Sequence, residues 1–167
     1  MQTRDYDPTQ GQAFQGDVSI VPVPAGIALS TDDEIKPIDG RLIIQEGEAT
    51  GHHHAIALPR ARAFKPPRPI GDPTLETTSA RLRRAFGGGK RTDVGTARLY
   101  RDPNVAAQMV AQGLMMRADL AVATLVVEGG PVMISHEEHD SIRVPPGRYL
   151  VGRQIESAGA EERVVAD

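Results

Sequence analysis

Glycine and proline recur at short intervals along this chain, and they constrain its fold more than any other feature. The 167 residues include 17 glycines and 13 prolines, which break helices and mark turns. The segments between them are short and rich in valine, isoleucine and leucine, as is typical of short strands. The sequence therefore predicts a mainly β protein. We expect a single compact antiparallel β-sandwich or barrel-like domain, with one or two short helices in an inserted region.

Several segments fit the expectation of strands. They are residues 16–24, 41–45, 51–58, 95–101, 121–129, 131–135, 141–145 and 148–156. Together they indicate one β-rich domain over residues 16–156. We expect residues 1–15 to form a polar arm that orders only against a partner or a neighbouring subunit. Residues 157–167 are expected to form a short helix or a disordered tail.

The stretch from about 60 to 120 is expected to be an excursion from the strands. Proline, glycine and arginine dominate residues 60–93 and no period-two pattern survives there, so this part is predicted to contribute little to the core. A brief amphipathic helix fits residues 78–86. A clearer helical pattern follows, for which either Asp102 or Asn104 can serve as the N-cap.

Charge and composition exclude several classes of partner. The formal net charge of −3 gives no indication of binding to nucleic acid or to an anionic membrane, which attract basic proteins. No apolar run reaches membrane-spanning length, and the amino terminus does not resemble a signal peptide. We therefore expect a cytoplasmic protein, or a virion protein if a phage encodes it. The chain has no cysteine, so a metal ion would be held by histidine, aspartate or glutamate.

The histidines form the candidate site. His52 and His54 are expected on one face of a strand and His53 on the other, because side chains alternate along a strand. Far along the chain, His136 and His139 flank two glutamates at the end of another strand. We predict that His52 and His54 lie within metal-bridging reach of His136 or His139.

A shared histidine site of this kind is typical of a divalent metal ion. Three or four imidazoles without a thiolate suit zinc, manganese or iron. Four ligands would suggest a closed structural site, whereas three would leave a position for a reactive water, with Glu138 as the candidate general base. The alternative is a polar surface run and a solvated turn that bind nothing. The presence of all five histidines in two short segments favours the shared site.

Two longer segments resemble a known family. EGEATGHHHAI (46–56) and SHEEHDSIRVPPGRYLVGRQIE (135–156) are similar to segments of small uncharacterised proteins of bacteria and their phages. That family has a GHxH segment early and an HEEHxPIxLPPGxY-like segment near the carboxyl end. This chain departs from it at Ser141, where the family has proline, and in its long stretch over 59–120. The resemblance implies a compact β fold and a histidine-rich site, and it implies no particular activity.

A looser likeness is to cupins, which carry an HxH pair on a strand and a later P-x-G turn, here Pro145 to Gly147. The glutamate that cupins have shortly after HxH is missing. Leu150 stands where the later cupin histidine is expected. The likeness therefore concerns the fold more than the active site, and a fold alone does not establish a function.

Three functions are carried forward as hypotheses. The first is a metal-binding β protein that acts as an accessory or structural component of a larger assembly, either a homo-oligomer or a complex with other proteins. The second is a metal-dependent enzyme, a hydrolase or a cupin-like protein. The third is a structural protein of a phage or phage-like particle, in which a metal ion is incidental.

Overall fold

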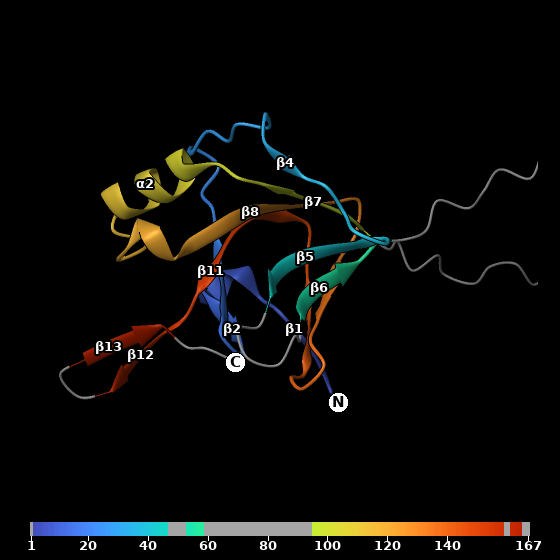
Figure 1. Cartoon of the computed structure of the whole chain (residues 1–167). Coiled ribbons are helices and arrows are strands. Elements are labelled where there is room, and N and C mark those ends of the chain that lie inside the picture. The colour runs from blue at the N-terminus through green and yellow to red at the C-terminus, as the bar shows by residue number, and fades with distance from the viewer. Residues whose placement is uncertain (1, 47–52, 59–94, 159–160, 165–167) are drawn as a thin grey trace, which may run out of the picture.

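Two packed β-sheets form the body of the protein (Figure 1). The structure, a computed structural model, describes residues 2–46, 53–58, 95–158 and 161–164. The five-stranded sheet has the order β1 (Thr3–Asp5), β10 (Ser141–Val144), β9 (Val132–Ser135), β6 (His53–Ala57) and β5 (Arg41–Glu46). The six-stranded sheet has the order β2 (Ala13–Gln15), β3 (Val18–Pro22), β11 (Gly147–Arg153), β8 (Ala121–Glu128), β7 (Thr96–Tyr100) and β4 (Glu34–Ile35). The expected mainly β sandwich is confirmed.

Within the described residues, neighbouring strands of both sheets run antiparallel, with the exception of the parallel pair β1 and β10. The main core lies between the sheets, where alternate side chains of the facing strands meet. Fully buried examples are Ile20 of β3, Leu42 of β5, Leu125 of β8, Ile134 of β9 and Val151 of β11. With few aromatic residues in the chain, this core is built mainly from branched aliphatic side chains.

In the described part of the chain, one α-helix packs on the outside of the six-stranded sheet. This helix, α2 (Pro103–Ala111), is preceded by Asp102 as its N-cap and begins with a proline, which suits the first turn. It ends before Gly113, whose φ of 70° is the left-handed conformation that favours glycine after a helix. Val105 and Met109 are fully buried in a second cluster with Leu150 of β11. Two short 3-10 helices, η1 (Pro8–Gln10) and η2 (Ala118–Leu120), complete the described helical elements.

Asp102 is held in place by two backbone groups. Its Oδ1 accepts from the N–H of Asn104 at 3.0 Å, and its Oδ2 accepts from the N–H of Ser30 at 2.7 Å. We expect Asp102→Ala to lower the free energy of unfolding by about 2 kcal/mol, because a helix cap and a charged hydrogen bond are lost together. Chemical denaturation measures the change. Asp119→Ala, at an exposed ion pair with Arg117, is the control and should change stability little; equal losses in both variants would contradict the prediction.

Both ends of the described chain differ from the expectation. Residues of the expected polar arm form β1 and β2, which pair with β10 and β3. The expected helical or disordered tail contains instead a hairpin of β12 (Ile155–Ala158) and β13 (Glu161–Val164). The predicted excursion over 60–93 and the helix over 78–86 lie outside the described residues.

None of the helices in the described part of the chain is long and apolar enough to span a membrane.

Candidate functional site

Histidine, carboxylate and amide side chains gather at one end of the space between the sheets. They come from the end of β2 and the turn that follows it, from β5 and β6, and from the turn between β9 and β10. We call the following six residues the polar cluster: Gln15, Asp17, Gln45, His54, His136 and His139. Gln15, Asp17, His54 and His136 are at most 4% exposed, so this cluster belongs to the interior of the fold.

The register between β6 and β9 explains how the histidines meet. Ala55 pairs with Ser135 and Ile56 pairs with Ile134. Extending this antiparallel register by one position places His54 opposite His136, on the face that points into the protein. Their ring centroids lie 4.3 Å apart, with 25° between the ring planes.

His139 joins the other two histidines through the bend after β9. Its ring centroid lies 4.6 Å from that of His136 and 6.2 Å from that of His54. The three rings are within 25° of parallel. The structure therefore brings together three of the four predicted ligands, from segments about half the chain apart, while His52 lies outside the described residues.

Gln15 and Asp17 reach the histidines from a tight turn. Gln15 pairs with Val18, so Gly16 and Asp17 form a two-residue hairpin loop. Gly16 has a φ of 55°, a conformation that glycine adopts without strain. The side chains on both sides of this glycine turn inward: Gln15 Oε1 lies 3.2 Å from His54 Nδ1, and Asp17 Oδ1 lies 2.7 Å from His54 Nε2.

Gln45 enters the cluster because β5 carries a β-bulge. The pairing of β5 with β6 shifts between Ile43 and Gln45. Ile44 and Gln45 are both buried, and the bulge lets these consecutive residues turn towards the same side of the sheet. Gln45 Nε2 donates to Asp17 Oδ2, while its buried Oε1 has no hydrogen-bond partner among the described residues.

Hydrogen bonds determine which nitrogen of His54 carries the proton. Gln15 Nε2 donates to the carbonyl oxygens of Ile134 at 3.3 Å and Asp140 at 2.8 Å, so Gln15 Oε1 has to accept from His54 Nδ1–H. Burial lowers the pKa of His54, although the carboxylate of Asp17 opposes this shift. In the neutral form of the ring, this tautomer has a lone pair on Nε2.

That lone pair faces a carboxylate oxygen. Asp17 Oδ1 and His54 Nε2 are close, but neither has a hydrogen-bond partner of acceptable geometry within the described residues. Two lone pairs at this separation repel each other unless a cation, either a proton or a metal ion, lies beside them. Two ligand atoms that are each about 2.0–2.2 Å from one tetrahedral ion are themselves about 3.3–3.6 Å apart, so these two atoms would move slightly apart around an ion.

His136 has the opposite tautomer to His54. Its Nδ1 accepts from the backbone N–H of Glu138 at 3.2 Å, so a neutral ring carries its proton on Nε2. In the described residues, no group of three or more histidine, aspartate and glutamate side chains has the geometry to hold a metal ion as it stands. The candidate general base Glu138 is exposed on the turn.

The outer face of the five-stranded sheet carries a separate hollow of about 220 Å³. Its lining includes Arg41, His53, Ser135, His136 and Glu137. His53 is partly exposed on this side, as the predicted alternation requires, and its backbone N–H donates to the carboxylate of Glu137 at 3.0 Å. His136 thus links the buried polar cluster to a hollow at the surface.

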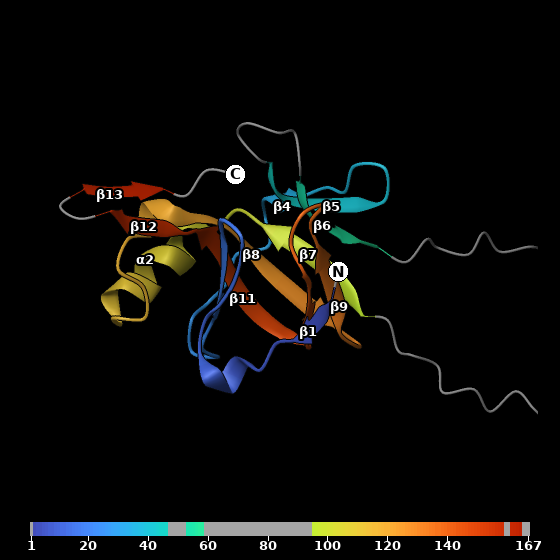
Figure 2. The ribbon, with the colours of Figure 1, turned by 90° about the horizontal axis from the view of Figure 1, so that it is seen from below.

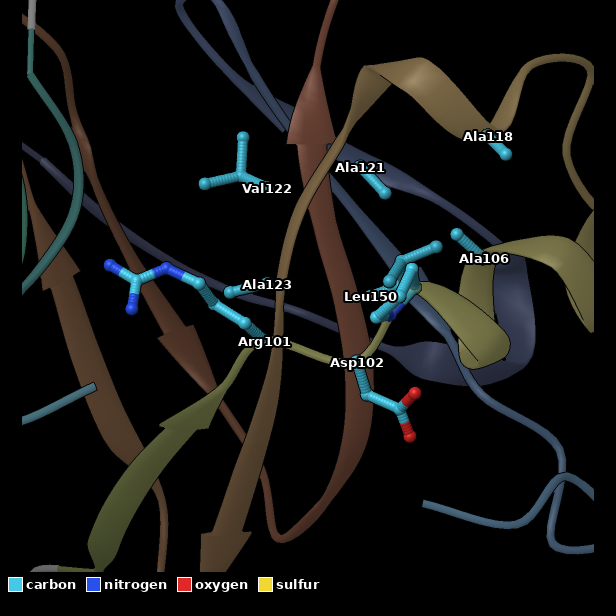
Figure 3. Close-up of a pocket in the computed structure, with 9 residues that line it drawn as sticks. Arg101, Asp102, Ala106, Ala118, Ala121, Val122, Ala123 and Leu150 are labelled. Carbon is cyan, nitrogen blue, oxygen red and sulfur yellow. The ribbon is translucent and has the colours of Figure 1, made fainter. Parts of the chain in front are cut away.

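A second hollow, of about 210 Å³, lies between α2 and β8 (Figure 3). Alanines at positions 106, 118, 121 and 123 make up much of its lining, together with Leu150. The charged residues in the lining are Arg101 and Asp102, and the Asp102 carboxylate is occupied in capping the helix. This hollow lacks the convergent polar groups of a candidate active site.

Comparison with known proteins gives one match. The model of a family described as a domain of unknown function (DUF8820) matches residues 14–84, which agrees with the expectation of an uncharacterised family. No curated protein and no solved structure matches the chain. The matched segment includes Gln15, Asp17, Gln45 and His54, and it ends before His136 and His139. The likeness to cupins and to the HEEH-containing segment stays a prediction.

Proposed function

We propose that this protein binds a divalent metal ion at the polar cluster and acts as an accessory or structural component of a larger assembly. The observation that carries the proposal is the contact between His54 Nε2 and Asp17 Oδ1, 2.7 Å apart in the interior. With the proton of His54 held on Nδ1 by Gln15, both atoms present lone pairs to the same space. A cation between them removes the repulsion and compensates for the burial of the carboxylate.

The proposed ligand set consists of His54 and Asp17, with His136, His139 and His52 as the remaining candidates. The ring centroids of His136 and His139 are within 4.3–6.2 Å of His54, a distance that imidazoles on one ion can have. To bind through Nε2, His136 has to give up its contact with the N–H of Glu138. Gln15 would act as the outer hydrogen-bond partner that orients His54, as is usual for metal-bound histidine.

This mixture of imidazole and carboxylate ligands favours zinc, iron or manganese over calcium or magnesium, which prefer oxygen ligands alone. A structural role is supported by the origin of the ligands. The ion would join the β2–β3 turn, β6 and the β9–β10 turn, which are far apart in sequence. Since such a site exists only in the folded chain, binding would stabilise the fold.

Metal analysis of protein purified without an affinity tag tests the proposal. We expect about one equivalent of a transition metal per chain, and an apoprotein that unfolds at a lower temperature. The stabilisation should reach about 3–4 kcal/mol when free metal exceeds the dissociation constant by two to three orders of magnitude. Wild-type protein that holds no metal and is not stabilised by added zinc, manganese or iron would contradict the proposal.

A matched set of histidine variants locates the ion. His54→Ala and His139→Ala should lose the bound metal and the stability that depends on it, because both rings belong to the polar cluster. His53→Ala is the control, since it removes a neighbouring imidazole on the opposite face of β6 and should retain the metal. Metal loss from His53→Ala, with retention by the other two variants, would place any ion elsewhere.

A metal-dependent enzyme is the second candidate. The hollow beside His136 favours it, because a ligand there would approach the cluster from the surface. Glu138 would then be the candidate general base. A metal-loaded protein whose stability does not change on metal removal, together with a labile water on the ion, would support this reading over the structural one.

A further inference from the structure

The outer face of the six-stranded sheet is only partly covered by α2. Beside the helix lies a groove of about 210 Å³. Its apolar lining comes from β2, β3, the segment after α2 and the end of η2, and consists of Phe14, Val21, Leu114, Met115, Met116 and Leu120. We call this feature the methionine groove.

The methionine groove exposes large apolar side chains. Met116 is 90% exposed, Leu114 is 44% exposed and Phe14 is 37% exposed. Only two other large apolar side chains of the described residues are exposed, Ile38 and Met133. Exposed apolar residues that gather in one place mark a contact surface, whereas scattered ones need no explanation. Methionine is common at surfaces that adapt to a partner.

The hairpin of β12 and β13 begins at the edge of this groove. Arg153 and Gln154, which precede the hairpin, line the groove, and both views show the hairpin projecting from the body (Figures 1 and 2). Its two strands pair with each other and with neither of the two main sheets. A two-stranded hairpin that stands alone in water is marginally stable at best. A surface to pack on would therefore stabilise it.

We propose that two copies of this chain form a two-fold dimer in which the hairpin of each copy lies in the methionine groove of the other. Because the hairpin and the groove lie at the same end of the chain, each of two copies can insert its hairpin into the groove of the other. A two-fold axis relates the two contacts and closes the assembly. The charges do not oppose this contact. The hairpin carries Glu156, Glu161 and Glu162 against Arg163, and the charged residue in the groove lining is Arg153.

This inference identifies the larger assembly of the proposed function as a dimer of this chain. It rests on the assembly part of that proposal and is independent of the metal ion. The groove and the hairpin lie outside the polar cluster. Molecular mass and metal content are measured separately on the same wild-type sample. A monomer that binds metal would overturn the dimer alone, and a metal-free dimer would overturn the metal site alone.

Light scattering coupled to size-exclusion chromatography tests the interface. Wild-type protein should have twice the chain mass of 17.9 kDa, and the double variant Leu114→Glu with Met116→Glu should have the single-chain mass. Met133→Glu is the control, because Met133 is an exposed methionine on β9 of the other sheet, and it should remain dimeric. A monomeric wild-type protein, or a groove variant that stays dimeric, would overturn the proposal.

A mixing experiment distinguishes arm exchange from direct contact between two grooves. The arm variant Ile155→Glu with Val164→Glu alters residues that are paired in the hairpin register, and alone it should be monomeric. Mixed with the groove variant, it should recover dimers of one chain of each kind, because one intact hairpin then meets one intact groove. Circular dichroism establishes that each variant is folded. Folded variants that form no mixed dimer would overturn arm exchange.

Discussion

Replacing Asp17 with alanine is expected to lower the free energy of unfolding by about 2–3 kcal/mol, because the buried amide of Gln45 loses its charged hydrogen-bond acceptor. In the wild-type protein, Asp17 accepts from Gln45 Nε2 and lies against His54 Nε2, and its side chain is 2% exposed. The variant leaves the Gln45 amide buried without that acceptor. Urea denaturation of metal-free protein measures the change apart from any contribution of an ion.

Asp5→Ala provides the matched control for this prediction. Asp5 faces the basic side chain of Arg143, with 3.6 Å between the two groups, and this pair is largely exposed. Exposed ion pairs contribute little to stability, so this variant should unfold much like wild type. If Asp17→Ala were no more destabilising than Asp5→Ala, the polar cluster would contribute little to holding the sheets together.

The second large effect is expected from Gly95→Ala. A Cβ at this position would lie 1.8 Å from the carbonyl oxygen of Gly130 and 2.5 Å from its carbonyl carbon. Both are backbone atoms of the turn between β8 and β9, so no side-chain rotation relieves the overlap. We expect a loss of about 3 kcal/mol or more, beyond the usual cost of overpacking. Thermal unfolding measures it, and a variant as stable as wild type would contradict the close approach.

Gly26→Ala is the control for that substitution. A Cβ at Gly26 meets no atom within 4 Å, and its φ is not in the left-handed region. Alanine there restricts the unfolded chain without strain in the fold, so stability should stay the same or rise by about 0.4–1 kcal/mol. Similar destabilisation in both variants would indicate that glycine itself, and not the contact with Gly130, is required.

The strands of the core could be predicted because turn residues bound them and their apolar side chains are closely spaced. The three-residue strands β1 and β2 could not. All three residues of β1 are exposed, so its sequence carries no alternation, and its position depends on pairing with a strand far along the chain. The hairpin of β12 and β13 was missed for a related reason, since its alanines and glutamates favour a helix when considered alone.

The histidine cluster was predictable in part. Alternation along β6 predicts that His53 and His54 lie on opposite faces, but which face points inward, and the register that sets His54 opposite His136, are tertiary properties. Asp17 was missed because the segment before it read as a polar arm. A glycine followed by a polar residue is nevertheless a known signal for a two-residue hairpin loop. The role of Gln45 could not be predicted, because its inward direction depends on a β-bulge for which the sequence has no recognisable signal.

The pairing of the first strand with the tenth sets an order of events during synthesis. Gln2 bonds to Asp140, 138 residues away, and the polar cluster combines residues near position 15 with residues near position 136. Until β9 and β10 have been synthesised, β1 lacks its pairing partner, and His136 and His139 are not yet part of the chain. Proteins dominated by such distant pairings fold on the order of milliseconds to seconds. The proposed metal site would therefore form only after both His segments have been synthesised, so that an ion would bind during folding of the full chain and not during its synthesis.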